Sequence, residues 1–141
     1  MKTIKVKKWE EVPEDYTGVV DHVKGHKLWY LNGKTHRVDG PAVEYADGYK
    51  SWLLHGELHR VDGPAVERAN GIKEWYLNGK LHRVDGPAIE HVNGDKEWWL
   101  NGKSFCLKEE WQKELDKSKP TCNGKTVEID GKKYKLVLSE G

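Results

Sequence analysis

The sequence has little cysteine and no long apolar run. Its 141 residues include two cysteines, Cys106 and Cys122, which are too few for a disulfide-stabilised scaffold. No apolar stretch approaches the roughly 18 residues that cross a bilayer, and the N-terminal residues lack the apolar segment of a secretory signal. We therefore expect a cytoplasmic protein with reduced thiols and no membrane association.

A surplus of charge of one sign is also missing. The chain has 24 lysines and arginines against 23 aspartates and glutamates, which gives a formal net charge of +1. Proteins that wrap nucleic acid usually carry a clear basic surplus. Composition therefore argues against a large nucleic-acid surface and leaves room for a small basic patch.

The signatures of common enzymes are absent. The sequence contains no G-x-S-x-G, no P-loop, no G-x-G-x-x-G, no H-E-x-x-H and no C-x-x-C motif, each of which places a nucleophile, a phosphate or a metal. We expect no enzymatic activity, no catalytic residue, no bound metal and no cofactor.

Repetition is what the sequence has in abundance. The period is 23 residues, and the array covers residues 17–103 with one degenerate unit, three full units and a partial fourth. Stacked units of this kind form linear arrays whose end units are atypical. The repeating columns are Trp29, Trp52, Trp75 and Trp98; His36, His59 and His82; Arg37, Arg60 and Arg83; Asp39, Asp62 and Asp85; Glu44, Glu67 and Glu90; and Gly-Pro-Ala triplets from Gly40, Gly63 and Gly86.

Each unit predicts β-strands joined by tight turns. The Ala-Val-Glu and Lys-x-Trp-Tyr-Leu segments favour β-branched or aromatic residues, and Asn-Gly or Asp-Gly pairs between strands are typical of type I′ hairpins. The fold class is therefore mainly β, a single-layered antiparallel meander of hairpin repeats. The predicted turns are Asp47-Gly48, Asn70-Gly71 and Asn93-Gly94, and, after each Trp strand, Asn32-Gly33, His55-Gly56, Asn78-Gly79 and Asn101-Gly102.

Two flanking segments complete the predicted domain organisation. Residues 1–16 suit an edge strand, in which lysines alternating with Ile4 and Val6 discourage pairing with other chains. Residues 104–141 predict a helix with Ser104 as N-cap and a Leu107, Trp111 and Leu115 stripe, then a final hairpin over 126–138. We expect this segment to cap the open end of the array.

The repeat resembles a known family. Its 23-residue period and Trp-Tyr-Leu-Asn-Gly-Lys core are similar to variant MORN-type repeats, and the His-Arg-x-Asp-Gly-Pro-Ala-x-Glu string is similar to small repeat proteins of tailed bacteriophages. The sequence departs from the repeat pattern at Leu53, His55 and Trp99. The resemblance implies a hairpin array that binds a partner, usually a protein, and, for a phage protein, the host cytoplasm as its location.

The columns supply two sets of candidate binding residues. By strand alternation the Trp column is expected to fill the packed face, with its neighbours forming an exposed aromatic row opposite. Equivalent His residues should lie roughly 9–10 Å apart, too far to share one metal. The His-Arg columns therefore either stack the units, by bonding to Asp or to turn amides, or form a binding ladder. The candidates are Tyr30, Tyr76 and Trp99, together with His36, Arg37, His59, Arg60, His82 and Arg83.

The leading hypothesis is a non-catalytic protein-binding repeat module, and the phage resemblance implies an inhibitor of a host or anti-phage defence protein. One alternative is nucleic-acid or nucleotide binding through the His-Arg ladder, although Asp39, Asp62 and Asp85 weaken its field. Another is a structural component of a virion.

Overall fold

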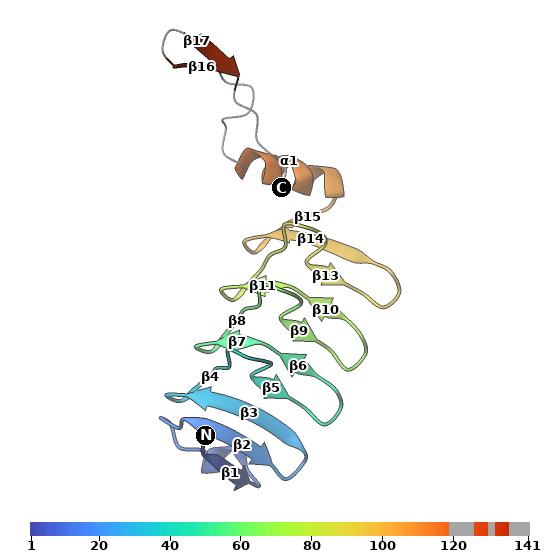
Figure 1. The fold of residues 1–141 in the computed structure, drawn as a ribbon. Helices are drawn as coiled ribbons and strands as arrows, with labels where there is room; N and C mark the ends of the chain where they lie inside the picture. The colour runs from blue at the N-terminus through green and yellow to red at the C-terminus, as the bar shows by residue number, and fades with distance from the viewer. Residues whose placement is uncertain (119–125, 130–131, 136–141) are drawn as a thin grey trace. The chain divides into compact units, whose positions relative to one another are not determined.

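The computed structural model describes residues 1–118, 126–129 and 132–135 (Figure 1). The chain divides into two compact units, Met1–Cys106 and Leu107–Gly141. The first unit is a stack of β-hairpins joined in a meander, which confirms the predicted mainly β fold.

A sheet of eleven short strands runs through the first unit. Its order is β1-β2-β3-β5-β6-β9-β10-β13-β14-β15, and β4 also pairs with β3. Two small hairpins, β7-β8 and β11-β12, lie outside this sheet. Strand β7 follows β6 after Trp52, and β11 follows β10 after Trp75. The bounds are β1 Thr3–Val6, β2 Gly18–His22, β3 His26–Leu31, β4 Lys34–Thr35, β5 Val43–Glu44, β6 Lys50–Ser51, β7 Leu53–Leu54, β8 Glu57–Leu58, β9 Val66–Glu67, β10 Lys73–Glu74, β11 Tyr76–Leu77, β12 Lys80–Leu81, β13 Ile89–Glu90, β14 Lys96–Leu100 and β15 Lys103–Phe105.

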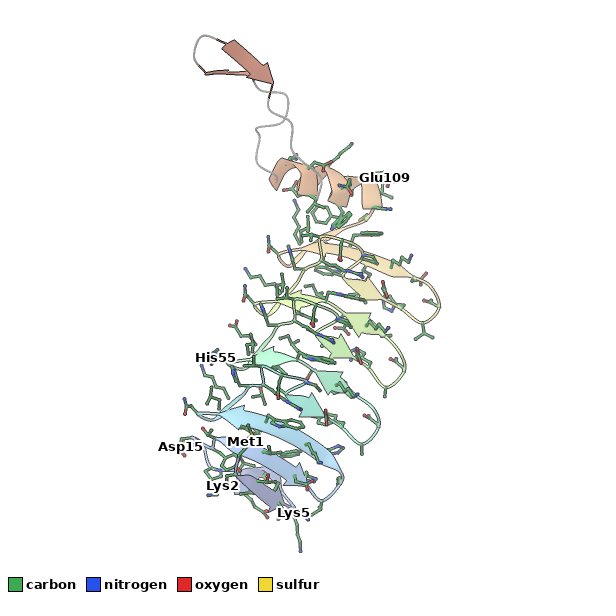
Figure 2. All side chains as sticks on the ribbon, in the orientation of Figure 1. Met1, Lys2, Lys5, Asp15, His55 and Glu109 are labelled. Atoms are coloured by element: carbon green, nitrogen blue, oxygen red, sulfur yellow. The ribbon has the colours of Figure 1, made fainter. Side chains whose placement is uncertain are left out.

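Strand β1 is an exception to the antiparallel meander. It ends the sheet, as predicted for a lysine-rich edge, but it pairs with β2 in parallel, with Thr3 opposite Val19 and Val6 opposite His22. Parallel neighbours need a crossover connection, and here the chain returns through the 3-10 helix η1, Trp9–Glu11. Lys2 and Lys5 mark this end of the unit in Figure 2.

The two sets of turns differ in type. After each Trp strand both turn residues are left-handed, for example Asn78 at φ 50° and Gly79 at φ 77°, which confirms type I′ turns. The other set was also predicted as type I′, and that prediction is wrong. Tyr45 and Tyr49 close a three-residue loop in which Gly48 donates to the Tyr45 carbonyl and has a φ of 99°. Asp47 instead accepts the Tyr49 N–H through its side chain.

The strand register produces two continuous rows of side chains, one on each face of the sheet. One row alternates in charge without interruption, so opposite charges are direct cross-strand neighbours, a pairing that stabilises a sheet by about 0.2–1 kcal/mol each. It consists of Lys5, Asp21, Lys27, Glu44, Lys50, Glu67, Lys73, Glu90 and Lys96. The other row consists of Ile4, Val20, Leu28, Val43, Ser51, Val66, Glu74, Ile89 and Glu97.

The core has side chains from both faces: Ala42, Ala65 and Ala88, opposite the column tryptophans, are fully buried, and the second row supplies an apolar cluster. Val20, Leu28 and Val43 form a buried cluster with Val6 and Tyr16. Tyr30 and Leu53 pack against this cluster and are half-buried, as are Tyr76, Trp99 and the four column tryptophans. The Trp face is packed, as predicted, because arginine covers it, but the aromatic row on the opposite face is half-buried and not fully exposed.

The second unit holds helix α1, Lys108–Ser118, and a hairpin of β16, Thr126–Ile129, with β17, Lys132–Lys135. Ser104 is not the helix N-cap, because it lies in β15 and pairs with Trp99. Cys122, the predicted turn at 130–131 and residues 136–138 of the predicted hairpin lie outside the described residues. Capping of the array by this segment stays a prediction.

Among the residues that the structure describes, no helix is both long and apolar enough to cross a membrane.

Candidate functional site

The face of the sheet that carries the Trp column repeats from unit to unit, and we call it the constant face. On it an arginine covers each tryptophan of the first three units. The Cζ atom of Arg60 lies 3.9 Å from the ring centroid of Trp52. Such cation–π contacts contribute about 0.5–1 kcal/mol at exposed sites. The same pair recurs as Arg37 on Trp29 at 4.0 Å and Arg83 on Trp75 at 3.9 Å.

Each of these arginines also holds the loop that leads to the next unit. Arg60 Nε donates to Asp62 at 2.9 Å, and its Nη1 donates to the carbonyl of Pro64 at 3.1 Å and lies 3.8 Å from Glu67. The hydrogen bond from Arg60 and its charge lower the pKa of the Asp62 carboxyl. The other two units repeat these contacts.

The glycine of each Gly-Pro-Ala triplet is required by this arginine. A Cβ atom at Gly63 would lie 2.9 Å from the Cζ atom of Arg60, and the equivalent distances at Gly40 and Gly86 are also 2.9 Å. A side chain at this position would push the guanidinium off its tryptophan.

The histidines join each unit to the next. Nδ1 of His36, His59 and His82 accepts the backbone N–H of the first turn residue of the following unit, at 3.0, 3.1 and 3.0 Å. These bonds keep Nδ1 unprotonated, and burial lowers the pKa of His36 and His82. The predicted bond to turn amides is confirmed. The aspartates pair with arginine instead of histidine.

All six predicted His and Arg site residues therefore have structural partners on the constant face or at its turns. Within the described residues, no group of three or more His, Cys, Asp or Glu side chains is arranged to hold a metal ion. The valine that follows each of the first two arginines is exposed: Val38 is 83% exposed and Val61 is 84% exposed.

The opposite face carries the positions at which the units differ, and we call it the variable face. Along the row, Leu28 is replaced in successive units by Ser51, Glu74 and Glu97. The columns beside it change as strongly, and one of them holds the predicted residues Tyr30, Tyr76 and Trp99, each in a different unit. They are His22, Tyr45, Arg68 and His91; His26, Tyr49, Ile72 and Asp95; and Tyr30, Leu53, Tyr76 and Trp99.

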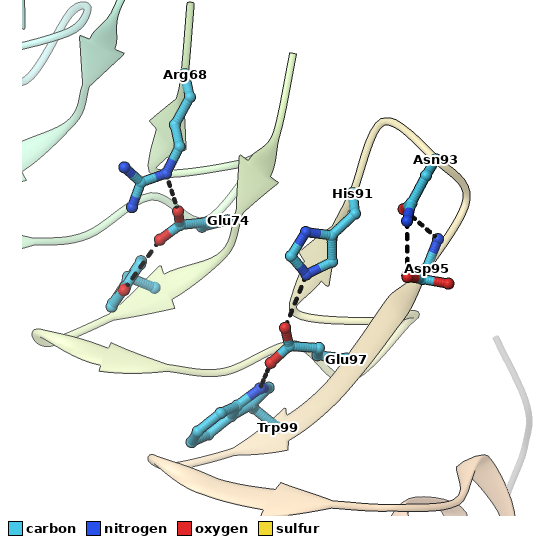
Figure 3. Close-up of polar contacts among 8 residues, drawn as sticks. Arg68, Glu74, His91, Asn93, Asp95, Glu97 and Trp99 are labelled. Carbon is cyan, nitrogen blue, oxygen red and sulfur yellow. Dashed lines mark hydrogen bonds and ion pairs between the residues drawn. The ribbon is translucent and has the colours of Figure 1, made fainter. Parts of the chain in front are cut away.

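Two polar networks occupy the C-terminal half of the variable face (Figure 3). Buried Glu74 pairs with Arg68 and accepts the Tyr76 hydroxyl at 3.1 Å. Burial, and then the charge and hydrogen bond of Glu74, raise the pKa of Tyr76 to about 12. In the next unit Glu97 contacts Nε2 of His91 at 2.7 Å and accepts the Trp99 indole N–H at 3.2 Å (Figure 3).

Aromatic rings occupy the N-terminal half of the same face. Trp9 stacks on His22 with centroids 4.5 Å apart and planes at 24°. The contacts continue from His22 to His26 at 5.8 Å, from His26 to Tyr45 at 4.6 Å and from Tyr45 to Tyr49 at 5.2 Å. The sequence prediction did not include these residues, because they do not belong to columns that repeat. Reading which residues depart from each column would have found four of the five.

Comparison of the chain with protein-family models, with curated proteins and with solved structures gives no match. The resemblance to MORN-type repeats therefore stays a prediction.

Proposed function

We propose that the chain is a non-catalytic protein-binding repeat module whose contact surface is the variable face. One observation carries this proposal: on the constant face the repeating side chains contact one another, whereas the strand positions that differ between units lie on the other face, where they alternate with a repeating valine or isoleucine. In repeat proteins, each unit needs the same residues to stack on its neighbours, so the residues that vary are the ones left to set specificity.

The composition of the variable face suits a protein partner. Tyr, Trp and Arg dominate the energetics of protein interfaces, and the face presents Tyr76 and Trp99, both half-buried, beside Arg68, whose side chain is 50% exposed. The carboxylates Glu74 and Glu97 lie among them. A nucleic-acid backbone along this half of the face would meet those negative charges, so the variable face suits a protein better than a nucleic acid.

The resemblance to phage repeat proteins directs the choice of partner. We propose that the target is a bacterial host or anti-phage defence protein and that binding inhibits it. The sequence resemblance alone supports this part of the proposal.

The test begins with affinity capture from a bacterial lysate, followed by purification of the captured protein and measurement of its Kd. Replacing Tyr76 or Trp99 by alanine should weaken binding by about 2 kcal/mol or more, as at interface hot spots. The matched controls are Val61→Ala and Val84→Ala, which change exposed side chains at the other face and should leave the Kd unchanged. Loss of binding in the valine variants but not in the aromatic ones would assign the contact to the constant face.

The two alternatives predict different behaviour. Binding of nucleic acid through Arg37, Arg60 and Arg83 requires an affinity that falls steeply with salt, while a virion component should self-assemble at moderate concentration. The contacts of these arginines with Trp, Asp and backbone carbonyl groups leave them few donors for phosphate, so we expect no steep dependence of affinity on salt.

A further inference from the structure

A cavity of about 610 Å³, broadly open to solvent, lies at the N-terminal end of the variable face. Its wall is built from three separate stretches of chain: the segment around η1, the end of β2 and the start of β3. Its lining includes Lys7, Lys8, Trp9, His22, Lys24 and His26. None of these residues belongs to the nine that the sequence marked as candidates.

The cavity is basic and rich in hydrogen-bond donors. Three lysines face a single acidic lining residue, Glu10, and Glu11 binds the backbone N–H of Lys7 instead. Nδ1 of His22 accepts the Lys24 amide at 3.1 Å, and Nδ1 of His26 accepts the Ala46 amide at 3.2 Å. Both rings therefore carry their proton on Nε2 and act there as donors. A site of this kind selects an anion.

The cavity also has an aromatic wall. Trp9 is held in place by stacking on His22, which is only 5% exposed, yet Trp9 itself remains 40% exposed. An exposed, oriented indole is a platform on which a nucleobase stacks. The volume falls within the range of about 300–1,000 Å³ that is typical of small-ligand sites.

We propose that this cavity binds a nucleoside phosphate, with the base on Trp9 and the phosphate groups against Lys7, Lys8 and Lys24. A ligand that uses the whole cavity must carry both a planar ring and a polyanion, because the wall offers one stacking surface, Trp9, beside several lysines. An acidic peptide would satisfy the lysines but leave the indole uncovered. This site is independent of the protein-binding proposal, since it uses no side chain tested there.

The experiment measures binding to the full chain by calorimetry at low salt, with ATP, AMP, adenosine and inorganic tripolyphosphate as probes. ATP should bind more tightly than AMP, and AMP more tightly than adenosine. Trp9→Ala should weaken ATP binding by about tenfold, while Trp9→Phe, which keeps a ring, should lose much less. The paired change Lys8→Ala and Lys24→Ala should weaken ATP binding by about tenfold and reduce its salt dependence.

The matched control is the pair Lys34→Ala and Lys80→Ala, which removes the same charge from exposed first residues of β4 and β12 and should leave ATP affinity unchanged. Circular dichroism and a thermal melt check that each variant is folded, and Trp9→Phe replaces Trp9→Ala if the latter unfolds. A further measurement with oligothymidylate distinguishes a free nucleotide from a nucleotide within a single strand. If the oligonucleotide binds more tightly than ATP, and this binding is lost in the Trp9 variant, the ligand is a segment of single strand.

Three results would overturn the proposal. The first is no saturable binding of ATP or the oligonucleotide at millimolar concentration. The second is tripolyphosphate binding as tightly as ATP with no effect of Trp9 replacement, which would leave an anion site without base recognition. The third is an equal loss in the control lysine pair, which would show non-specific attraction.

Discussion

The two faces of the sheet use the same period in opposite ways. On the constant face, Arg60 makes the same contacts as its equivalents, with distances that agree within a few tenths of an ångström for the Trp, Asp and Pro partners. On the variable face, the position after Lys50 is a buried serine, Ser51, and its equivalent in the next unit is a buried glutamate, Glu74. Repetition therefore identifies the residues that hold units together, and departure from repetition identifies the residues free to acquire a function.

The variable face itself changes along the array. At its N-terminal end Val20, Leu28 and Val43 form an apolar core. Toward the other end the row includes Glu74 and Glu97. Glu74 contacts Arg68 and the Tyr76 hydroxyl, and Glu97 contacts His91 and the Trp99 indole. Of the two, Glu74 is buried, whereas the Glu97 side chain is 43% exposed. A buried carboxylate costs free energy unless it is paired and hydrogen-bonded, so the polar end of the face depends on the partners of Glu74.

The largest expected effect is a difference in unfolding free energy between variants of Trp75 and Tyr76, which are adjacent in the sequence and lie on opposite faces. Trp75→Ala removes the ring beneath Arg83 and should lower the free energy of unfolding by about 3 kcal/mol. Tyr76→Ala should cost about 1–2 kcal/mol, because it removes a half-buried ring and its hydrogen bond to Glu74. Urea denaturation of both variants gives the difference. Equal losses would mean that the faces contribute alike to stability.

Gly63→Ala tests the contact between Arg60 and its loop. The added methyl group conflicts with the guanidinium at 2.9 Å and should cost about 1–2 kcal/mol of unfolding free energy. In a background that carries Arg60→Ala the cost should nearly vanish, since the obstructed side chain is gone. Additive losses in this double-mutant cycle would show that the glycine is needed for another reason.

Glu74→Gln tests the polar network of the variable face. Gln retains a hydrogen-bond acceptor for Tyr76 but loses the charge that pairs with Arg68, so we expect a loss of about 1 kcal/mol for this partly exposed pair. The pKa of Tyr76, raised to about 12 mainly by burial and next by Glu74, should fall toward 10. Ultraviolet titration of tyrosinate follows this change, and Tyr76→Phe identifies the signal.

The pKa of Tyr76 also has a consequence for stability. The raised pKa in the folded state means that its contribution is complete below pH 10 and is lost as the pH rises to about 12. Tyr76→Phe should make the unfolding free energy less dependent on pH in this window. An unchanged slope between the two proteins would contradict the assignment.

The smallest effect is expected at acid pH. Burial lowers the pKa of His36 and His82 below 6.5, so their contribution is present above pH 6.5 and is lost as the pH falls through the folded-state pKa. Melting temperatures measured from neutral to mildly acid pH should decline, and the double variant His36→Asn and His82→Asn should decline less. A steeper decline in the variant would contradict the structural role of Nδ1.

Much of the fold follows from local chemistry in the sequence. Asn32, Asn78 and Asn101 tolerate the left-handed region before glycine, so the positions of three type I′ turns were predictable. The type of the other turns was not, because it depends on which residues form the closing pair, here Tyr45 and Tyr49. A shift by one residue in that pair moves every side chain to the opposite face.

The sequence by itself determined the 23-residue period, the β-strands, the turn positions and the columns of residues that must act together. The tertiary structure alone decided how the Trp face is covered, because that depends on Arg60 turning back over Trp52 from a loop eight residues later. It also decided that β1 pairs in parallel and that η1 brings Trp9 onto His22. Periodicity is a property of local spacing, whereas these contacts depend on how distant segments are brought together in three dimensions.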